Sequence, residues 1–203
     1  MTNIDQFGII WNLNSEGFRT VEFDSIDYSK TRMLCIGDSH TYGAGNQEQE
    51  IWPELLKNKL GIEQILNLGV PGVSADHLAR NITSYVDRFK PEEVFVLWPD
   101  YSRFEYDDYG VIKQSLPTDS NRIYFMETAT EEWLLSNFKS AQDKVTYTCR
   151  KNNIKLRTLT LYDLIPIIDH ADRWPIAANE THFNHKWHNL VAEIFAFKHD
   201  CDI

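Results

Sequence analysis

The chain has 203 residues, 42% of them hydrophobic, and no Pro/Gly/Ser-rich or low-complexity stretch divides it, so we expect one compact domain over residues 1–203. Its 20 Lys and Arg residues against 30 Asp and Glu residues give a formal net charge of -10, which repels phosphate backbones and anionic membrane surfaces. We therefore expect neither nucleic acid nor membranes as partners. No apolar run approaches transmembrane length.

The residue pattern in the first half of the chain predicts an N-terminal segment that leads into the first core strand, followed by alternating strands and helices. Residues 1–30 contain NLNSEGFRTVEF, which indicates a short hairpin or an extended lead-in that closes an end of the sheet. RMLCIG is typical of a strand buried on both faces, and EQILNLGVPG of a second strand ending in a Gly-rich loop. The predicted helices are QEIWPELLKNKLG, with Pro53 in its first turn and Gly61 at its end, and SADHLARNITSYVDRF, with Ser74 as N-cap.

The second half continues this alternation around one irregular insert. EVFVLWP predicts a third strand, and residues 100–126 follow as an acidic and aromatic stretch that we interpret as a lid over the carboxyl edge. TEEWLLSNFKSAQDKVTYTCRKN predicts a helix capped by Thr130, IKLRTLTLY an alternating strand, and HKWHNLVAEIFAFK a closing amphipathic helix. The expected fold class is α/β, a three-layer α/β/α sandwich with a central parallel sheet.

A serine lies directly after the first core strand, in the turn Gly37-Asp38-Ser39-His40. Loops at the carboxyl ends of parallel strands are where open α/β sheets place ligands, so Ser39 is a candidate nucleophile. Asp and Ser after a strand are also ordinary N-cap and turn residues, so a purely structural role stays open.

Motifs at both ends of the chain resemble the SGNH (GDSL-type) hydrolase family. Gly37-Asp38-Ser39 matches the family's first block, Gly69 in NLGVPG the second, and His182 in HFNHKWHNLVA the histidine of the last block. NSEGFR is similar to the NSxGFR segment that precedes the serine block in many of these esterases. The G-x-S-x-G elbow of α/β-hydrolases is absent around Ser39, which disfavours that competing fold.

The resemblance implies a Ser-His acyl-enzyme mechanism. Neutral His182 would accept the Ser39 proton as the hydroxyl attacks an acyl carbonyl, and would then protonate the leaving alcohol. The backbone N–H groups of Ser39 and Gly69 are the oxyanion donors that the family pattern supplies.

Two departures from the family pattern fall on functional positions. Asp100 stands where the family has an oxyanion-hole Asn, and a carboxylate accepts hydrogen bonds rather than donating them. Arg103 is a candidate substitute donor, or it only pairs with Asp100 or Glu105. Asn179 stands where the family has the Asp that orients the histidine, and we expect its amide oxygen to orient His182. The alternative residues that could orient His182 are the carboxylates Asp169, Asp172 and Glu180.

The remaining histidines do not predict a metal centre. His182, His185 and His188 lack the ligand partners of a zinc site, and we expect His188 to lie on the helix surface or in packing. His40 and His77 are interpreted as loop or cap residues, and no metal or cofactor is expected.

The expected activity is hydrolysis of an ester, an acyl or acetyl group on a small molecule or carbohydrate. One alternative is a catalytically weak or inactive SGNH-like domain with a binding or structural role, of the kind also found in phage genomes with a virion-associated role. Another is a flavodoxin-like module that binds an anion at a helix N-terminus. The three scattered cysteines and a start without a signal-peptide pattern indicate a cytoplasmic protein with reduced thiols, and the oligomeric state is not indicated.

Overall fold

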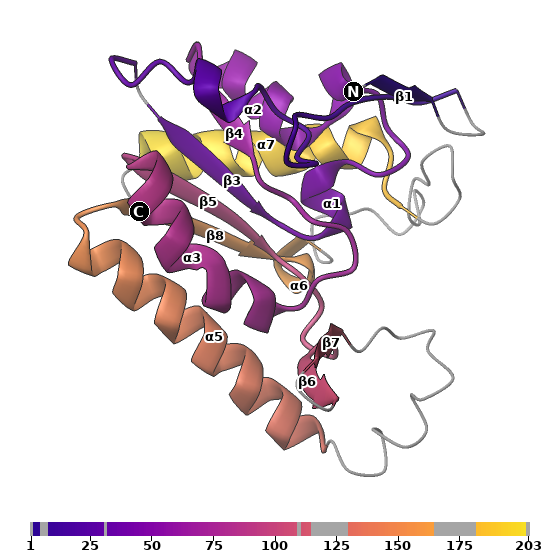
Figure 1. Cartoon of the computed structure of the whole chain (residues 1–203), viewed down its shortest axis with the longest axis vertical. Helices are drawn as coiled ribbons and strands as arrows, with labels where there is room; N and C mark the ends of the chain where they lie inside the picture. Colours follow the sequence, from indigo (N-terminus) through magenta and orange to yellow (C-terminus); the bar gives the residue numbers. More distant parts are fainter. Residues whose placement is uncertain are drawn as a thin grey trace.

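A computed structural model describes residues 2–4, 8–30, 32–108, 111–114, 130–164 and 182–201. A central sheet lies between two layers of helices (Figure 1), as the sequence predicts for a three-layer α/β/α sandwich. No helix in these ranges combines the length and apolar character needed to cross a bilayer.

The central sheet has four strands in the order β4-β3-β5-β8, and every neighbouring pair is parallel. Their bounds are β3 Met33–Gly37, β4 Ile65–Asn67, β5 Glu93–Trp98 and β8 Lys155–Thr160. Gly37 pairs with Leu97, and Leu97 pairs with Leu159, so these strands end at the same edge. Because the strands are parallel, all their carboxyl-terminal loops leave from this edge.

Helices cover both faces of the sheet and explain why β3 and β5 are apolar without alternation. The helix α2 (Trp52–Leu60) packs beside α7 (His185–Asp200) on one face, and α3 (Ala75–Phe89) beside α5 (Glu131–Lys151) on the other (Figure 1). Along β3, Leu34 and Ile36 join the core under α3 and α5, whereas Met33 and Cys35 join the core under α2 and α7. A strand buried on both faces needs an apolar residue at each position.

The lead-in differs in detail from its prediction. The hairpin forms earlier than NLNSEGFRTVEF, between β1 (Thr2–Ile4) and β2 (Ile10–Asn12). Most of the predicted segment instead contains a turn, in which the Phe18 carbonyl accepts from the Asn14 N–H, and the 3-10 helix η1 (Phe23–Ser25). Its polar turn residues bond to one another rather than to a second strand.

Most predicted helix ends are confirmed. Gly61 ends α2 in the left-handed conformation, and the Thr130 hydroxyl accepts a hydrogen bond from the Trp133 N–H at the start of α5. Ser74 precedes α3 without a side-chain cap bond, and its hydroxyl lies 3.4 Å from the Asp76 carboxylate. Residues 48–50 form a separate 3-10 helix, η2 (Glu48–Glu50), before α2 begins.

The carboxyl edge carries short elements that the sequence did not predict. Two one-turn helices lie there, α1 (Ser39–Tyr42) after β3 and α6 (Leu161–Leu164) after β8 (Figure 1). The strand predicted through IKLRTLTLY therefore ends two residues early. Within the insert, β6 (Glu105–Asp108) and β7 (Val111–Gln114) form a hairpin, whereas residues 115–126 lie outside the described ranges, and the lid stays a prediction.

Candidate active site at the carboxyl edge of the sheet

Asp38, rather than Ser39, caps the helix that follows β3. The Asp38 carboxylate accepts a hydrogen bond of 3.0 Å from the His40 N–H, and Ser39 is the first residue of α1. Gly37 allows this tight turn, because a Cβ there would lie 2.6 Å from the Leu97 carbonyl oxygen. The cap requirement is thus met by the neighbouring residue, and the Ser39 hydroxyl has no capping role to fill.

The lead-in holds the far end of the serine turn through a buried arginine. Arg19, from NSEGFR, is 2% exposed and donates to the carbonyl oxygens of Gly43 at 2.8 Å and Asn46 at 2.9 Å. Gly43 has a φ of 83°, a left-handed conformation that glycine adopts without strain. Arg19 therefore fixes the loop that carries the chain away from Ser39.

The last loop of the chain lies against the serine turn. The rings of His182 and His40 meet edge to face with centroids 5.4 Å apart, and Phe183 stacks on Trp187 at 4.3 Å. The Asn46 side chain donates to the Phe183 carbonyl oxygen at 2.8 Å. The structure thus places the loop of His182 against the turn that carries Ser39.

Burial keeps both histidines of the site neutral. It lowers the pKa of His40 to about 4, although the Asp38 carboxylate acts in the opposite direction. It also lowers the pKa of His182, with the Arg103 cation acting in the same direction and Asp38 opposing it. A neutral imidazole is the form that can accept a proton from a hydroxyl.

Arg103 forms an ion pair that the sequence did not predict. Its Nη1 lies 2.6 Å from Asp38 Oδ2, and the Asp38 side chain is 1% exposed. The expected partners are engaged elsewhere, since Arg80 binds the Glu105 carboxylate at 2.7 Å and Asp100 bonds within its own turn. The pairing of Arg103 with Asp100 or Glu105 is therefore corrected to Asp38, because the turn after β5 directs the guanidinium back toward β3.

Asp100, at the position of the family's oxyanion Asn, is an acceptor of two hydrogen bonds. It accepts from the Ser102 N–H at 2.8 Å and from the Tyr162 hydroxyl at 2.7 Å. Burial would raise the pKa of Asp100, but hydrogen bonds from Ser102 and Tyr162 and the Arg103 charge outweigh it and lower the pKa. An ionised Asp100 fixes Tyr162 at the end of β8. The sequence alone did not single out Tyr162.

Gly69 is held against the serine turn, and its N–H already has an acceptor. The Gly69 N–H donates to the Asn67 side-chain oxygen at 3.0 Å, and the Asn67 amide donates to the Thr41 carbonyl at 2.9 Å. A Cβ at position 69 would lie 2.3 Å from the Tyr42 backbone nitrogen. Close packing on α1 therefore accounts for this glycine, and Asn67, two residues earlier, is the side chain that ties the two loops together.

Several predicted residues lie outside the site or outside the described ranges. His188 is fully buried and accepts a hydrogen bond from the Trp52 N–H at 3.2 Å, so it is a packing residue. His77 lies within α3 beside Arg80, not in a loop or cap. Asn179 lies outside the described ranges, as do the candidate carboxylates Asp169, Asp172 and Glu180. No cluster of three metal-ligating side chains occurs in the part of the chain that the structure describes.

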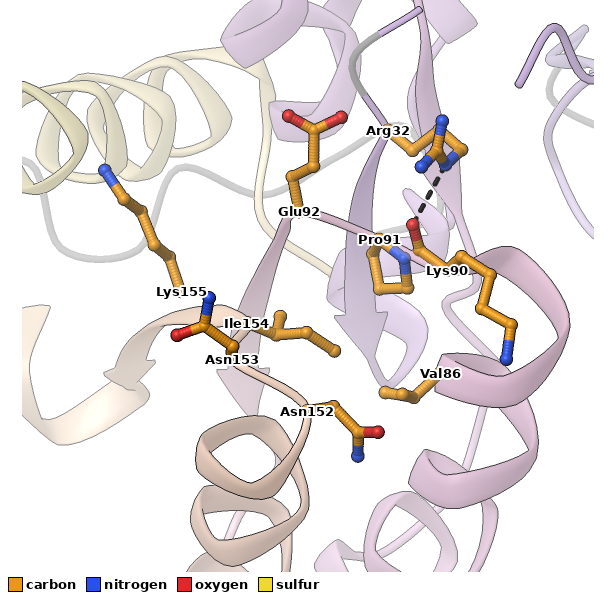
Figure 2. A pocket seen from close by; sticks show the side chains of 9 residues that line it. All are labelled: Arg32, Val86, Lys90, Pro91, Glu92, Asn152, Asn153, Ile154 and Lys155. Atoms are coloured by element: carbon orange, nitrogen blue, oxygen red, sulfur yellow. Dashed lines mark hydrogen bonds between the residues drawn. The ribbon is translucent and has the colours of Figure 1, made fainter. Parts of the chain in front are cut away.

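A pocket of about 400 Å³ opens at the opposite edge of the sheet (Figure 2). It is lined by Arg32, Val86, Lys90, Pro91, Glu92, Asn152, Asn153, Ile154 and Lys155. These residues lie at the ends of α3 and α5, in the turns that lead into β3, β5 and β8, or, for Lys155, at the first position of β8. The Arg32 guanidinium donates to the Lys90 carbonyl at 2.9 Å. The pocket is thus separated from Ser39 by the length of the strands.

The fold is similar to that of several solved structures. A protein described as lipolytic and of the G-D-S-L family, from Desulfitobacterium hafniense DCB-2, matches with a TM-score of 0.55 and 14% identity, over 82% of this chain and 98% of its own. TesA matches with a TM-score of 0.52 and 14% identity, over 80% of this chain and 94% of its own. No protein-family model matches the sequence, and the search of curated proteins found no match. The fold is therefore of the SGNH type that the motifs predict.

The buried ion pair generates a stability prediction. Arg103→Met should lower the free energy of unfolding by about 3 kcal/mol, because it leaves the Asp38 carboxylate buried without its cation. Thermal unfolding followed by circular dichroism should show a fall in Tm of roughly 6–12 °C for a domain of this size. The matched control is Arg88→Met, whose pair with Glu16 is exposed and should contribute about 0–1 kcal/mol. Equal losses in the two variants would contradict a special role for the buried pair.

Proposed function

We propose that this protein is a serine hydrolase that cleaves esters through an acyl-enzyme on Ser39. The observation that carries the proposal is the contact between the last loop and the serine turn, where His182 lies against His40 beside Ser39. The SGNH-type fold supports it, because Ser39 lies directly after β3 at the carboxyl edge, where open α/β sheets place ligands.

The proposed chemistry begins with neutral His182 as the general base. The imidazole takes the Ser39 proton while the oxygen attacks the ester carbonyl, and it then gives that proton to the leaving alcohol. Water, activated by the same imidazole, attacks the acyl-enzyme and releases the acid. Burial of the ring supports this role, because it keeps the imidazole neutral and ready to accept a proton. Asn179 remains the residue proposed to orient His182.

Oxyanion stabilisation must come from a donor set that differs from the family's. The Ser39 N–H is at the first position of α1, where no helical carbonyl can accept it. By contrast, the Gly69 N–H is bound to Asn67, and Asp100 is an acceptor. We therefore assign the side-chain donor to Arg103, whose Nη1 is held by Asp38 and whose buried Nε has no hydrogen-bond partner among the described residues.

The substrate that we propose is an uncharged ester of an acyl or acetyl group. Its alcohol part is a carbohydrate of small size. The competing function is an inactive SGNH-like domain retained for binding or assembly. The hydrogen bond of the Gly69 N–H and the acceptor at Asp100 favour that alternative, because both remove donors on which the family pattern relies. The experiments below distinguish the two.

Ser39→Ala should abolish hydrolysis of p-nitrophenyl acetate and labelling by a fluorophosphonate probe. Its Tm should stay within about 2 °C of the wild type, because Asp38 supplies the cap and the substitution removes only one hydroxyl. Ser136→Ala, on the exposed surface of α5, is the matched control and should retain both activities. A wild-type protein that shows neither hydrolysis nor labelling at Ser39 would favour the inactive alternative.

The pH dependence of kcat/KM should have an acid limb below pH 6.5, because burial lowers the pKa of His182 from that value. As the pH falls through the lowered pKa, the imidazole gains a proton and can no longer act as base. Arg103→Met removes a cation that lowers this pKa, so the limb should move to higher pH. A wild-type limb above pH 7 would contradict His182 as the base.

Arg103→Met should lower kcat for p-nitrophenyl acetate by about 10²–10³-fold with a small change in KM, because a lost oxyanion donor destabilises the transition state alone. Arg103→Lys should recover part of the loss, since the ammonium keeps the charge. Arg80→Met is the control, because Arg80 binds Glu105 instead of Asp38. The donor assignment fails if kcat of Arg103→Met stays within about threefold of the wild type.

A further inference from the structure

Two tyrosines lie side by side at the carboxyl edge, beyond the strands that neighbour the serine turn. Tyr101 follows β5 and Tyr162 is in α6 after β8, and their ring centroids are 5.6 Å apart. Tyr162 is 45% exposed, so part of its ring faces solvent at this edge. No step of the proposed mechanism uses either ring.

Both rings are held through their hydroxyl groups, so that their faces rather than their oxygens remain for contact. The Tyr162 hydroxyl donates to Asp100 at 2.7 Å, and the Tyr101 hydroxyl donates to Glu131 at 3.3 Å. Anchored aromatic rings offer contact area at a small cost in conformational entropy. The pair is therefore a preformed surface.

The backbone that carries the rings is also fixed. The Asp100 carbonyl accepts from the Arg103 N–H at 3.1 Å, closing a tight turn over Asp100–Arg103. At the start of α6 the Thr160 N–H donates to the Asp163 carboxylate at 2.7 Å, and the Asp163 N–H donates to the Thr160 hydroxyl at 3.2 Å. These bonds set the direction in which Tyr101 and Tyr162 leave the sheet.

The turn after β5 links the tyrosine pair to the reaction site. Arg103 at its end binds Asp38 of the serine turn, while Asp100 at its start binds Tyr162. Neighbouring strands lie about 4.8 Å apart, so the end of β8 is about 10 Å from the end of β3. That spacing suits the alcohol portion of an ester whose carbonyl lies at Ser39.

The charges around the rings restrict which alcohol fits. Asp100 and Glu131 flank the pair, and Arg103, the cation in the same turn as Tyr101, is already bound to Asp38. Such surroundings disfavour phosphate, sulfate and carboxylate groups. Carboxylate oxygens accept hydrogen bonds from hydroxyl groups, and ring faces contact C–H groups, a combination that matches the two sides of a sugar ring.

We propose that Tyr101 and Tyr162, flanked by Asp100, form a subsite for an uncharged sugar ring, the alcohol part of a carbohydrate ester. This inference rests on the proposed hydrolysis at Ser39, and it names the substrate class of that same site.

The first test compares three acetate esters in the full-length protein: an O-acetylated methyl glucoside, cyclohexyl acetate and p-nitrophenyl acetate. For each variant, kcat/KM for the sugar ester is divided by kcat/KM for p-nitrophenyl acetate. Tyr162→Ala should lower this ratio by about tenfold, chiefly by raising KM for the sugar ester. Tyr162→Phe, which keeps the ring, should stay within about threefold of the wild-type ratio. The control Tyr147→Ala, at a tyrosine that is 65% exposed on α5, should leave the ratio unchanged.

Two outcomes of this test would overturn the subsite while leaving hydrolysis at Ser39 intact. One is an unchanged ratio in Tyr162→Ala. The other is an equal preference for cyclohexyl acetate and the sugar ester, which would show a surface that selects apolar rings and ignores hydroxyl groups.

A binding test separates the subsite from the proposed reaction. Saturation-transfer NMR with methyl β-glucoside on Ser39→Ala protein should show contact with the sugar, and this signal should be lost in Ser39→Ala/Tyr101→Ala/Tyr162→Ala but not in Ser39→Ala/Tyr147→Ala. Binding with no hydrolysis by the wild type would support the subsite and refute the hydrolase. No sugar signal in Ser39→Ala, together with sugar-ester kinetics that do not respond to Tyr162→Ala, would refute the subsite.

Discussion

The buried ion pair between Asp38 and Arg103 is the constraint on which the carboxyl edge depends. Its 2.6 Å contact joins the turn after β3 to the turn after β5, and Asp38 also caps α1 through the His40 N–H. A carboxylate that is 1% exposed needs a cation and hydrogen bonds to offset its lost hydration. Because both oxygens of Asp38 are engaged, the position of Ser39 is fixed from two sides. The same pair brings one negative and one positive charge to the neighbourhood of His182.

This pairing gives a physical account of Asp100, the departure from the family pattern that follows β5. An Asn after β5 could donate to an oxyanion directly, whereas Asp100 turns its carboxylate to Ser102 and Tyr162. The turn that Asp100 closes then returns a guanidinium toward the serine turn. In this chain the carboxylate of Asp100 thus shares a turn with a cation three residues later, and the edge carries charges of both signs. Within the proposed function, one turn supplies the oxyanion donor at Arg103 and the sugar contact at Tyr101.

Segments remote in sequence hold the site by different forces. Arg19 fixes the exit of the serine turn by hydrogen bonds to the carbonyls of Gly43 and Asn46. On the other side, Phe183 and Trp187 stack in front of His40 and hold the loop of His182. The polar contacts are directional and set the backbone, whereas the aromatic contacts tolerate small shifts of the rings. As a result, the serine turn is fixed by polar contacts, and the loop of His182 packs against it through aromatic rings.

The sequence by itself determined the order of strands and helices, the α/β/α layers, and the edge at which Ser39 lies. Apolar runs, Gly61 and the Thr130 cap are local signals, and each depends on residues within one or two turns of the chain. The motifs also singled out Ser39 and His182 as candidate site residues, because the family pattern has a serine and a histidine in those blocks. Only the tertiary structure decided the partner of Arg103, the acceptor bound by the Gly69 N–H and the pairing of Tyr162 with Asp100. The contacts of Arg103 and Tyr162 join residues that follow different strands, and their geometry depends on strand register and turn direction. A linear pattern of residue types does not encode either one.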